Sequence, residues 1–137
     1  MKKKIGISAT GVLILLAALL LSACGAQAQK VERTVTMKEF AFEPETVEVP
    51  AGAEVTLHLS NTGALEHEYV IIKPGQQVTL PFDIDDEEKV YWEKELDKGL
   101  AETVTFTAPD EPGEYTVVCG TPGHLEAGMQ ARLVVTG

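Results

Sequence analysis

Residues 115–129 read Tyr-Thr-Val-Val-Cys-Gly-Thr-Pro-Gly-His-Leu-Glu-Ala-Gly-Met, and this stretch is the most informative part of the 137-residue chain. Its apolar, β-branched beginning predicts a strand that ends at Cys119. Pro122-Gly123 predicts a tight turn, which His124 follows directly. A second short loop leads to Met129 and the last strand. The stretch therefore offers a thiol, an imidazole and a thioether to one point at the end of a β-structure.

This combination of donors predicts a copper site. Soft sulfur ligands together with imidazole select copper, and two histidines, one cysteine and a distant axial methionine form an electron-transfer site. The second histidine would be His67, which opens a strand after the loop 61–65. In a Greek-key sandwich that loop can lie beside the loop of Cys119. A buried structural thiol is the common alternative, but it leaves the spacing of His124 and Met129 unexplained.

The chain between residues 33 and 137 alternates between apolar and polar side chains in short runs. The clearest run is Glu54–Ser60, in which Val55, Leu57 and Leu59 share one face. Short strands separated by glycine and proline turns predict an all-β sandwich or barrel. We expect further strands at Thr34–Lys38, Thr46–Val49, His67–Lys73, Gln77–Phe82, Thr103–Thr107, Glu114–Cys119 and Gln130–Thr136.

One segment, residues 83–102, departs from this β pattern. The acidic run 85–88 suits a helix N-terminus, where the helix dipole favours anions. Trp92 and Leu96 lie four residues apart, and Lys98-Gly99 is a typical C-terminal signal. We therefore expect an inserted helix of about three turns, anchored by Trp92.

The first 23 residues predict an export signal. Lysines at positions 2–4 precede an apolar run, residues 11–23. This run is shorter than the roughly 20 residues that a membrane-spanning helix needs. Residues 21–24, Leu-Ser-Ala-Cys, resemble the lipobox of bacterial lipoproteins, which implies cleavage before Cys24 and acylation of its sulfur. An ordinary signal peptide or an uncleaved anchor helix remains the alternative.

Residues 24–32 are mostly small and polar and predict a lipid-anchored tether, whereas residues 33–137 suit one domain. Anchoring through Cys24 implies an extracytoplasmic location at a membrane surface. Because Cys24 is then assigned to the lipid, Cys119 is a single thiol in an oxidising compartment. That situation favours a role for Cys119 as a metal ligand.

The chain is strongly acidic, with a net charge of −10, or −13 without the three signal lysines. This charge argues against nucleic acid and anionic lipid as partners, and it suits a basic partner. Alternatively, the acidity only keeps an exported protein soluble. The acidic segment 83–97 has the same two interpretations, a solvated face or a docking surface.

The sequence resembles the cupredoxins, the blue-copper family that includes plastocyanin, azurin and auracyanin. The resemblance rests on Phe40-Ala41-Phe42-Glu43-Pro44, the lead-in Leu59–Gly63, His67, and the Cys-x4-His-x4-Met motif that begins at Cys119. The spacing is nearer to auracyanin, rusticyanin and sulfocyanin-like proteins than to plastocyanin. The resemblance covers the mature domain and implies an all-β Greek-key sandwich with one short inserted helix.

The resemblance also implies the ligand roles around one copper ion. His67, Cys119 and His124 would be equatorial ligands. Met129 would be the axial ligand, and His124 would be the partly exposed ligand through which electrons pass.

Two residues near the site depart from the family pattern or compensate for it. Many cupredoxins have asparagine directly after the first histidine ligand, where this chain has Glu68. That asparagine helps to tie the two ligand loops together, and Asn61 is a candidate for the same role. The Glu68 carboxylate would lower the reduction potential if it stays charged and close to the thiolate.

Apolar residues should surround the exposed edge of His124. Leu65, Pro122, Leu125 and Ala127 are expected to form a small contact surface there. A weak, transient interface of this kind suits electron transfer with a redox protein such as a c-type cytochrome or a membrane oxidase.

We expect a monomeric one-electron carrier that cycles between Cu(I) and Cu(II), and not an enzyme. A copper enzyme needs a further, histidine-rich site, and only His58, expected at the surface, remains of the three histidines. The alternatives are a copper chaperone or storage protein, an accessory electron donor to a copper enzyme, and a metal-free sandwich for adhesion. Chaperones usually expose methionine or histidine clusters, whereas this chain has three methionines, of which Met37 is expected in the core.

Overall fold

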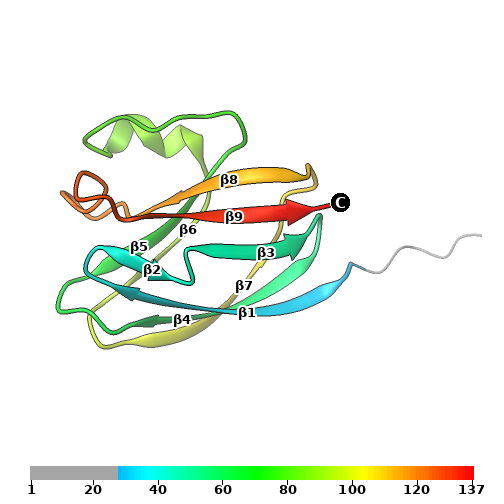
Figure 1. Cartoon of the computed structure of the whole chain (residues 1–137), viewed down its shortest axis with the longest axis horizontal. Helices are drawn as coiled ribbons and strands as arrows, with labels where there is room; N and C mark the ends of the chain where they lie inside the picture. The colour runs from blue at the N-terminus through cyan, green and yellow to red at the C-terminus, as the bar shows by residue number, and fades with distance from the viewer. Residues whose placement is uncertain (1–27) are drawn as a thin grey trace, which may run out of the picture.

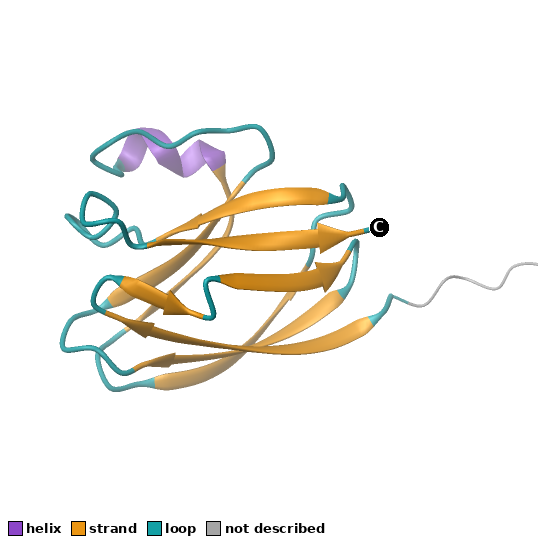
Figure 2. Cartoon of the chain, in the orientation of Figure 1, coloured by secondary structure: helices purple, strands orange, loops and turns teal. Residues whose placement is uncertain are grey.

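The computed structural model describes residues 28–137, which form nine strands in two sheets and one short helix (Figure 1). Figure 2 shows that strands make up nearly all of the regular structure. This arrangement confirms the prediction of an all-β fold with one short helix. The signal segment and Cys24 lie outside the described residues. No helix in the described part of the chain is long and apolar enough to cross a membrane.

The two sheets have the strand orders β2-β1-β4-β7 and β3-β9-β8-β5-β6. The chain passes from the first sheet to the second between β2 and β3. The pairs β1·β4 and β3·β9 are parallel, and the other pairs are antiparallel. The strands are β1 (Lys30–Lys38), β2 (Ala41–Glu43), β3 (Thr46–Pro50), β4 (Glu54–Asn61), β5 (His67–Ile72), β6 (Val90–Leu96), β7 (Ala101–Thr107), β8 (Gly113–Val118) and β9 (Gln130–Thr136).

The core lies between the sheets and follows the alternation of the sequence. In β4, Val55, Leu57 and Leu59 are each 1% exposed, as their shared face predicts. Met37 in β1 is fully buried, which confirms its expected place in the core. Each buried aliphatic side chain of this size contributes about 1.5–3 kcal/mol relative to exposure. The sandwich is therefore a stable scaffold for the loops at its ends.

Residues 83–102 contain a shorter helix than expected, so the prediction of a three-turn helix is wrong. Helix η2 (Ile84–Lys89) is a six-residue 3-10 helix that Asp83 caps through its side chain. The helix ends where β6 begins at Val90. Residues 90–96 instead pair antiparallel with β5, at the edge of the second sheet.

Trp92 consequently anchors a strand and not a helix. Its ring stacks on Phe106 of β7, with the ring centroids 4.7 Å apart. Trp92 and Leu96 share a face in β6 as they would in a helix, because a spacing of four residues fits both periods. Pairing with β5 makes this segment a strand and not a helix. Strand β5 lies too far away in the sequence for a local pattern to show that pairing.

Segment 73–89, which we call the strap, covers the outer face of the second sheet. Within it, Gln77–Phe82 is a loop and not the expected strand. Asp86 is fully buried in the strap and accepts a hydrogen bond of 2.7 Å from Lys89 Nζ. Apolar residues of the strap pack against those of the sheet below it, and the two groups are Val78 and Phe82 against Val70, Ile72, Val118 and Leu125.

The fold begins slightly earlier than expected. Strand β1 starts at Lys30, and residues 30–32 pair with 54–56 of β4. The last three residues of the expected tether therefore belong to the sandwich. The short strand β2 was not expected from the sequence, and it pairs with the end of β1 around the turn at Glu39-Phe40.

Candidate metal centre

The strand ends bring the expected ligands to one end of the sandwich. His67 is the first residue of β5. Cys119 directly follows β8, the strand that pairs antiparallel with β5. His124 lies in the loop between β8 and β9, and Met129 directly precedes β9. Figure 1 shows the loops β1–β2, β4–β5 and β8–β9 at the same end of the molecule, opposite the C-terminus. Segments that are far apart in the sequence thus meet there.

Backbone hydrogen bonds hold the donors of the β8–β9 loop together. Cys119 N donates to Met129 O (3.1 Å), and Met129 N donates to His124 O (2.9 Å). Gly123 and Gly128 have φ angles of 83° and 92°, a region that side-chain-bearing residues rarely adopt. Glycine at these two turns therefore lets the loop bend back on itself and bring all three residues to one place.

Two imidazole nitrogens and the thiol sulfur form a compact triangle. His67 Nδ1 lies 3.1 Å from His124 Nδ1, and Cys119 Sγ lies 3.4 Å from His124 Nδ1 and 3.8 Å from His67 Nδ1. The point equidistant from these atoms is about 2.0 Å from each, close to the metal–nitrogen distance of about 2.0–2.1 Å and somewhat short of the metal–thiolate distance of about 2.3 Å known for zinc. The triangle therefore fits one first-row metal ion.

The donors are buried, and the surroundings of His67 favour the form of its ring that binds metal. His67, Cys119 and Met129 are fully buried, and His124 is 4% exposed. Burial, and secondly the nearby His124, lower the pKa of His67. A neutral imidazole is the form that coordinates metal, so this shift prepares His67 as a ligand.

The comparisons with known proteins agree with this geometry. The family model of the cupredoxin-like domain matches residues 11–135 of the chain. This chain belongs to the cupredoxin family. Its cofactor is one copper ion, and the residues arranged as a type 1 copper site are the four expected from the sequence: His67, Cys119, His124 and Met129.

Among its relatives, this cupredoxin is 30% identical to auracyanin-B of Chloroflexus aurantiacus, over 80% of this chain and 53% of the relative. It is 28% identical to the copper-resistant cuproprotein CopI of Rubrivivax gelatinosus, over 80% and 68%. It is 31% identical to auracyanin-A of Chloroflexus aurantiacus, over 72% and 68%. The chain thus spans about half the length of auracyanin-B.

Solved structures show the same fold. Auracyanin B has a TM-score of 0.66 and 29% identity, over 80% of this chain and 90% of that one. Reduced auracyanin from Roseiflexus castenholzii has a TM-score of 0.61 and 28% identity, over 82% and 100%. Rusticyanin, at 23% identity and a TM-score of 0.58, shares the fold.

Glu68 shapes the surroundings of the thiol with both its backbone and its side chain. Its backbone N–H donates to Cys119 Sγ at 3.4 Å, which stabilises negative charge on the sulfur. Its carboxyl lies over Gly120, where a Cβ atom would be 2.0 Å from Glu68 Oε2. Burial, followed by repulsion from Glu93 and other glutamates, raises the pKa of Glu68 to about 7. The expected effect of a charged carboxylate on the reduction potential is therefore weakened near neutral pH.

Asn61 does not tie the two ligand loops together, so that expectation is wrong. Its amide nitrogen donates to Leu65 O (2.8 Å) and Leu96 O (2.9 Å), and its oxygen accepts from Gly63 N (2.9 Å). The bonds with Leu65 and Gly63 organise the loop before His67, and the bond to Leu96 joins this loop to the end of β6.

A side-chain tie between the ligand loops comes from Thr121, which no sequence motif indicated. Thr121 Oγ1 donates to Glu66 O at 3.2 Å, from the β8–β9 loop to the residue before His67. Its position two residues after Cys119 was the available signal, because side chains near one ligand are well placed to reach the loop of another.

The expected apolar surface is present in part. Leu65 is 51% exposed, and Pro122 and Ala127 are also exposed. Leu125 is only 8% exposed and packs into the cluster under the strap, so its assignment to an exposed surface is wrong. An apolar side chain that continues the sheet cluster is better buried than exposed, and the loop turns Leu125 inward.

Phe40, which no sequence motif placed at the metal site, covers one ligand. Its ring is 46% exposed and meets the His124 ring edge to face, with the centroids 5.3 Å apart. His124 therefore reaches the surface only slightly, less than the family resemblance implies.

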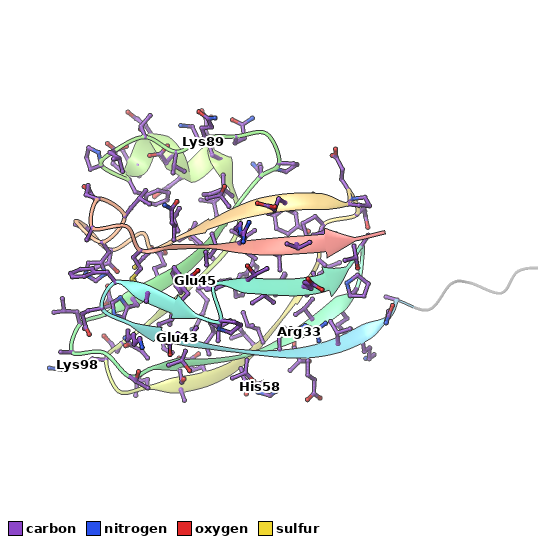
Figure 3. All side chains as sticks on the ribbon, in the orientation of Figure 1. Arg33, Glu43, Glu45, His58, Lys89 and Lys98 are labelled. Atoms are coloured by element: carbon purple, nitrogen blue, oxygen red, sulfur yellow. The ribbon has the colours of Figure 1, made fainter. Side chains whose placement is uncertain are left out.

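The third histidine, His58, lies on the outer face of the four-stranded sheet (Figure 3). Its side chain is 42% exposed, and its Nδ1 lies 2.9 Å from Thr103 Oγ1. This confirms the expected surface position, and it leaves His58 outside the copper site.

Proposed function

We propose that this cupredoxin is a one-electron carrier that works outside the cytoplasmic membrane. The observation that carries the proposal is the donor triangle of His67, Cys119 and His124, which is buried and compact enough for one metal ion. Bound copper supplies the Cu(I)/Cu(II) couple. The chain's part is to hold the donors on strand ends and backbone-bonded turns, so that little rearranges when an electron moves.

Electrons would enter and leave at the end of the molecule where His124 lies. Leu65, Pro122, Ala127 and Phe40 expose apolar surface around this end. A small apolar contact of this kind supports brief association with a redox partner, such as a c-type cytochrome or a membrane oxidase. The net negative charge of the chain favours a basic partner.

The location and the anchor are part of the same proposal. Cys24 follows an export signal and resembles a lipidation site. Acyl chains on Cys24 would hold the protein at a membrane surface, since each buried CH₂ contributes about 0.8 kcal/mol. Cys24→Ala should therefore release the protein into the soluble fraction, and retention at the membrane would contradict the anchor.

The copper site is tested by the visible spectrum after Cu(II) is added to the purified domain. An intense thiolate-to-copper charge-transfer band is expected, and Cys119→Ser should abolish it. His124→Ala should abolish or strongly alter the band, whereas His58→Ala, the matched control, should leave it unchanged. A colourless complex in the wild-type protein would refute the proposal.

A copper-storage or resistance role is the second candidate, and the similarity to CopI favours it. The complete burial of His67, Cys119 and Met129 favours the carrier, because a protein that hands over copper needs accessible ligands. Transfer of Cu(I) to a competing chelator distinguishes the two. The carrier should release copper slowly yet exchange electrons quickly, and the opposite result would favour storage.

A further inference from the structure

One atom of the copper site lacks a partner. Among the buried side-chain nitrogens and oxygens of residues 28–137, only His67 Nε2 has no hydrogen bond. Buried polar groups nearly always find a partner, and an orphan is a reason to look for the group that completes it. Nε2 is the nitrogen on the far side of the ring from Nδ1, which points toward Cys119 and His124.

A carboxylate faces this orphan nitrogen. Glu39 Oε1 lies 3.6 Å from His67 Nε2. The same oxygen accepts hydrogen bonds from the backbone N–H groups of Ala64 (2.6 Å) and Leu65 (3.0 Å). Glu39 therefore comes from the β1–β2 turn but is fixed to the loop that leads into His67.

Gly63 leaves room for this contact. A Cβ atom at residue 63 would lie 2.6 Å from Glu39 Oε1 and 2.8 Å from His67 Nε2. These distances are too short for any side chain, including that of alanine. The absence of a side chain at Gly63 is what allows the carboxylate and the imidazole to face each other.

Metal binding decides which nitrogen must carry the proton. A neutral imidazole has one N–H, and a ring that coordinates through Nδ1 carries it on Nε2. In the donor triangle, His67 Nδ1 lies 3.1 Å from His124 Nδ1, so a proton on either Nδ1 could be shared between the two rings. Only an acceptor at Nε2 favours the copper-binding tautomer of His67 over this competing arrangement.

We propose that Glu39 is a positioning residue that holds His67 in its copper-binding tautomer by accepting a hydrogen bond from Nε2–H. The inference rests on the copper site of the proposed function. Closing the 3.6 Å gap to the usual length of a charge-assisted bond needs an approach of less than about 1 Å. The neighbouring Phe40 packs on His124, so the β1–β2 turn supports both histidine ligands.

The test compares Glu39→Ala and Glu39→Gln with Glu43→Ala. Glu43 is a matched control, because it is an exposed glutamate of the adjacent strand β2 whose carboxylate is ion-paired with Lys38. Cu(I) affinity is measured by competition with a Cu(I) chelator. Glu39→Ala should weaken binding by about 10–100-fold, the usual effect of removing a partner that orients a metal ligand. Glu39→Gln, whose amide oxygen can accept the same bonds, should recover most of this loss, and Glu43→Ala should bind like the wild type.

A second measurement uses the metal-free protein and is independent of copper. Imidazole ¹⁵N NMR, at a pH where the rings are neutral, reports which nitrogen of His67 is protonated. The wild type and Glu43→Ala should favour Nε2–H, and Glu39→Ala should shift the population toward Nδ1–H. If the wild type shows this preference but forms no coloured copper complex, the proposed function fails while the role of Glu39 stands.

Gly63→Ala tests the same contact with the carboxylate retained. The added methyl group should push Glu39 and the His67 ring apart and weaken Cu(I) binding as Glu39→Ala does. If Glu39→Ala does not fold, as judged by thermal unfolding of the metal-free protein, the Gln and Gly63 variants still decide the question. Wild-type affinity and tautomer in these variants, or an equal loss in Glu43→Ala, would overturn the proposal.

Discussion

Replacement of Gly120 by alanine should show how tightly the residue after the thiolate ligand is packed. The added Cβ would lie 2.0 Å from Glu68 Oε2, 3.1 Å from Glu68 Cδ and 3.2 Å from Phe82 Cε1. The φ angle of Gly120 is not in the left-handed region, so alanine meets no backbone strain there. The cost therefore comes from displacing the half-buried carboxyl of Glu68 and pressing on Phe82.

Overpacking of this kind costs about 1–3 kcal/mol of unfolding free energy. We expect about 2 kcal/mol for Gly120→Ala, because the Glu68 carboxyl must move away while the Phe82 ring shifts only a little. With an m-value of about 2 kcal/mol/M, the midpoint of urea unfolding should fall by about 1 M. In a Glu68→Ala background the main clash is absent, and the same substitution should cost only about 0.5 kcal/mol. The coupling energy between the two positions is then about 1.5 kcal/mol, which lies in the range for residues in contact.

The assay is urea unfolding of the metal-free wild type, both single variants and the double variant, at a single pH. The cycle uses only differences, so any effect of removing the Glu68 carboxyl by itself cancels. An equal cost of Gly120→Ala in both backgrounds would refute the reasoning, because it would mean that Glu68 does not occupy the space over Gly120.

The remaining predictions concern the strap and the site loops. Asp86→Asn should destabilise the protein by about 1–3 kcal/mol at pH 7. Hydrogen bonds, first that from the Lys89 ammonium, lower the pKa of Asp86, so its stabilising effect is present above the ordinary carboxyl pKa and is lost as the pH falls below it. The unfolding free energies of the wild type and Asp86→Asn should therefore converge between pH 7 and pH 2. A constant difference between them would contradict this prediction. Thr121→Val should cost about 0.5–1.5 kcal/mol by breaking the tie between the ligand loops, and Thr121→Ser should not. Gly128→Ala should cost about 1–2 kcal/mol for its positive φ and weaken Cu(I) binding, whereas the control Gly75→Ala, also at positive φ, should affect stability alone.

Most of the copper site could be predicted from the sequence, because three of its four ligands lie close together in the chain. Cys119, His124 and Met129 lie within eleven residues, and the turns between them need glycine, so spacing and turn residues were enough to predict them. The sequence around His67 does not by itself identify this residue as a ligand. Its place depended on the antiparallel pairing of β5 with β8, which only the fold provides.

The errors have a common physical cause, which is that a local pattern cannot show a distant partner. Val90–Leu96 satisfied the apolar spacing of a helix and of a strand, and the pairing with β5 decided between them. Asn61 and Thr121 are both polar residues near a ligand, and only the course of the two loops determines which one reaches across. Glu39 lies 28 residues before His67, and no sequence pattern joins the two positions.

Segments that are distant in the sequence hold the copper ligands, so copper binding and folding are linked. The β1–β2 turn, the Thr121 bond and the backbone bonds of the β8–β9 loop hold the donors close together. Because these contacts exist only in the folded chain, copper binds the native state and should stabilise the protein by mass action, as any ligand of the native state does. Burial of two facing imidazoles, with only a 3.6 Å contact from His67 Nε2 to Glu39 Oε1, costs folding free energy. Substitution of a ligand by an apolar residue of similar size, such as His67→Leu, should consequently raise the stability of the metal-free protein while it abolishes copper binding, and a large loss of stability would show that the imidazole also holds the core together.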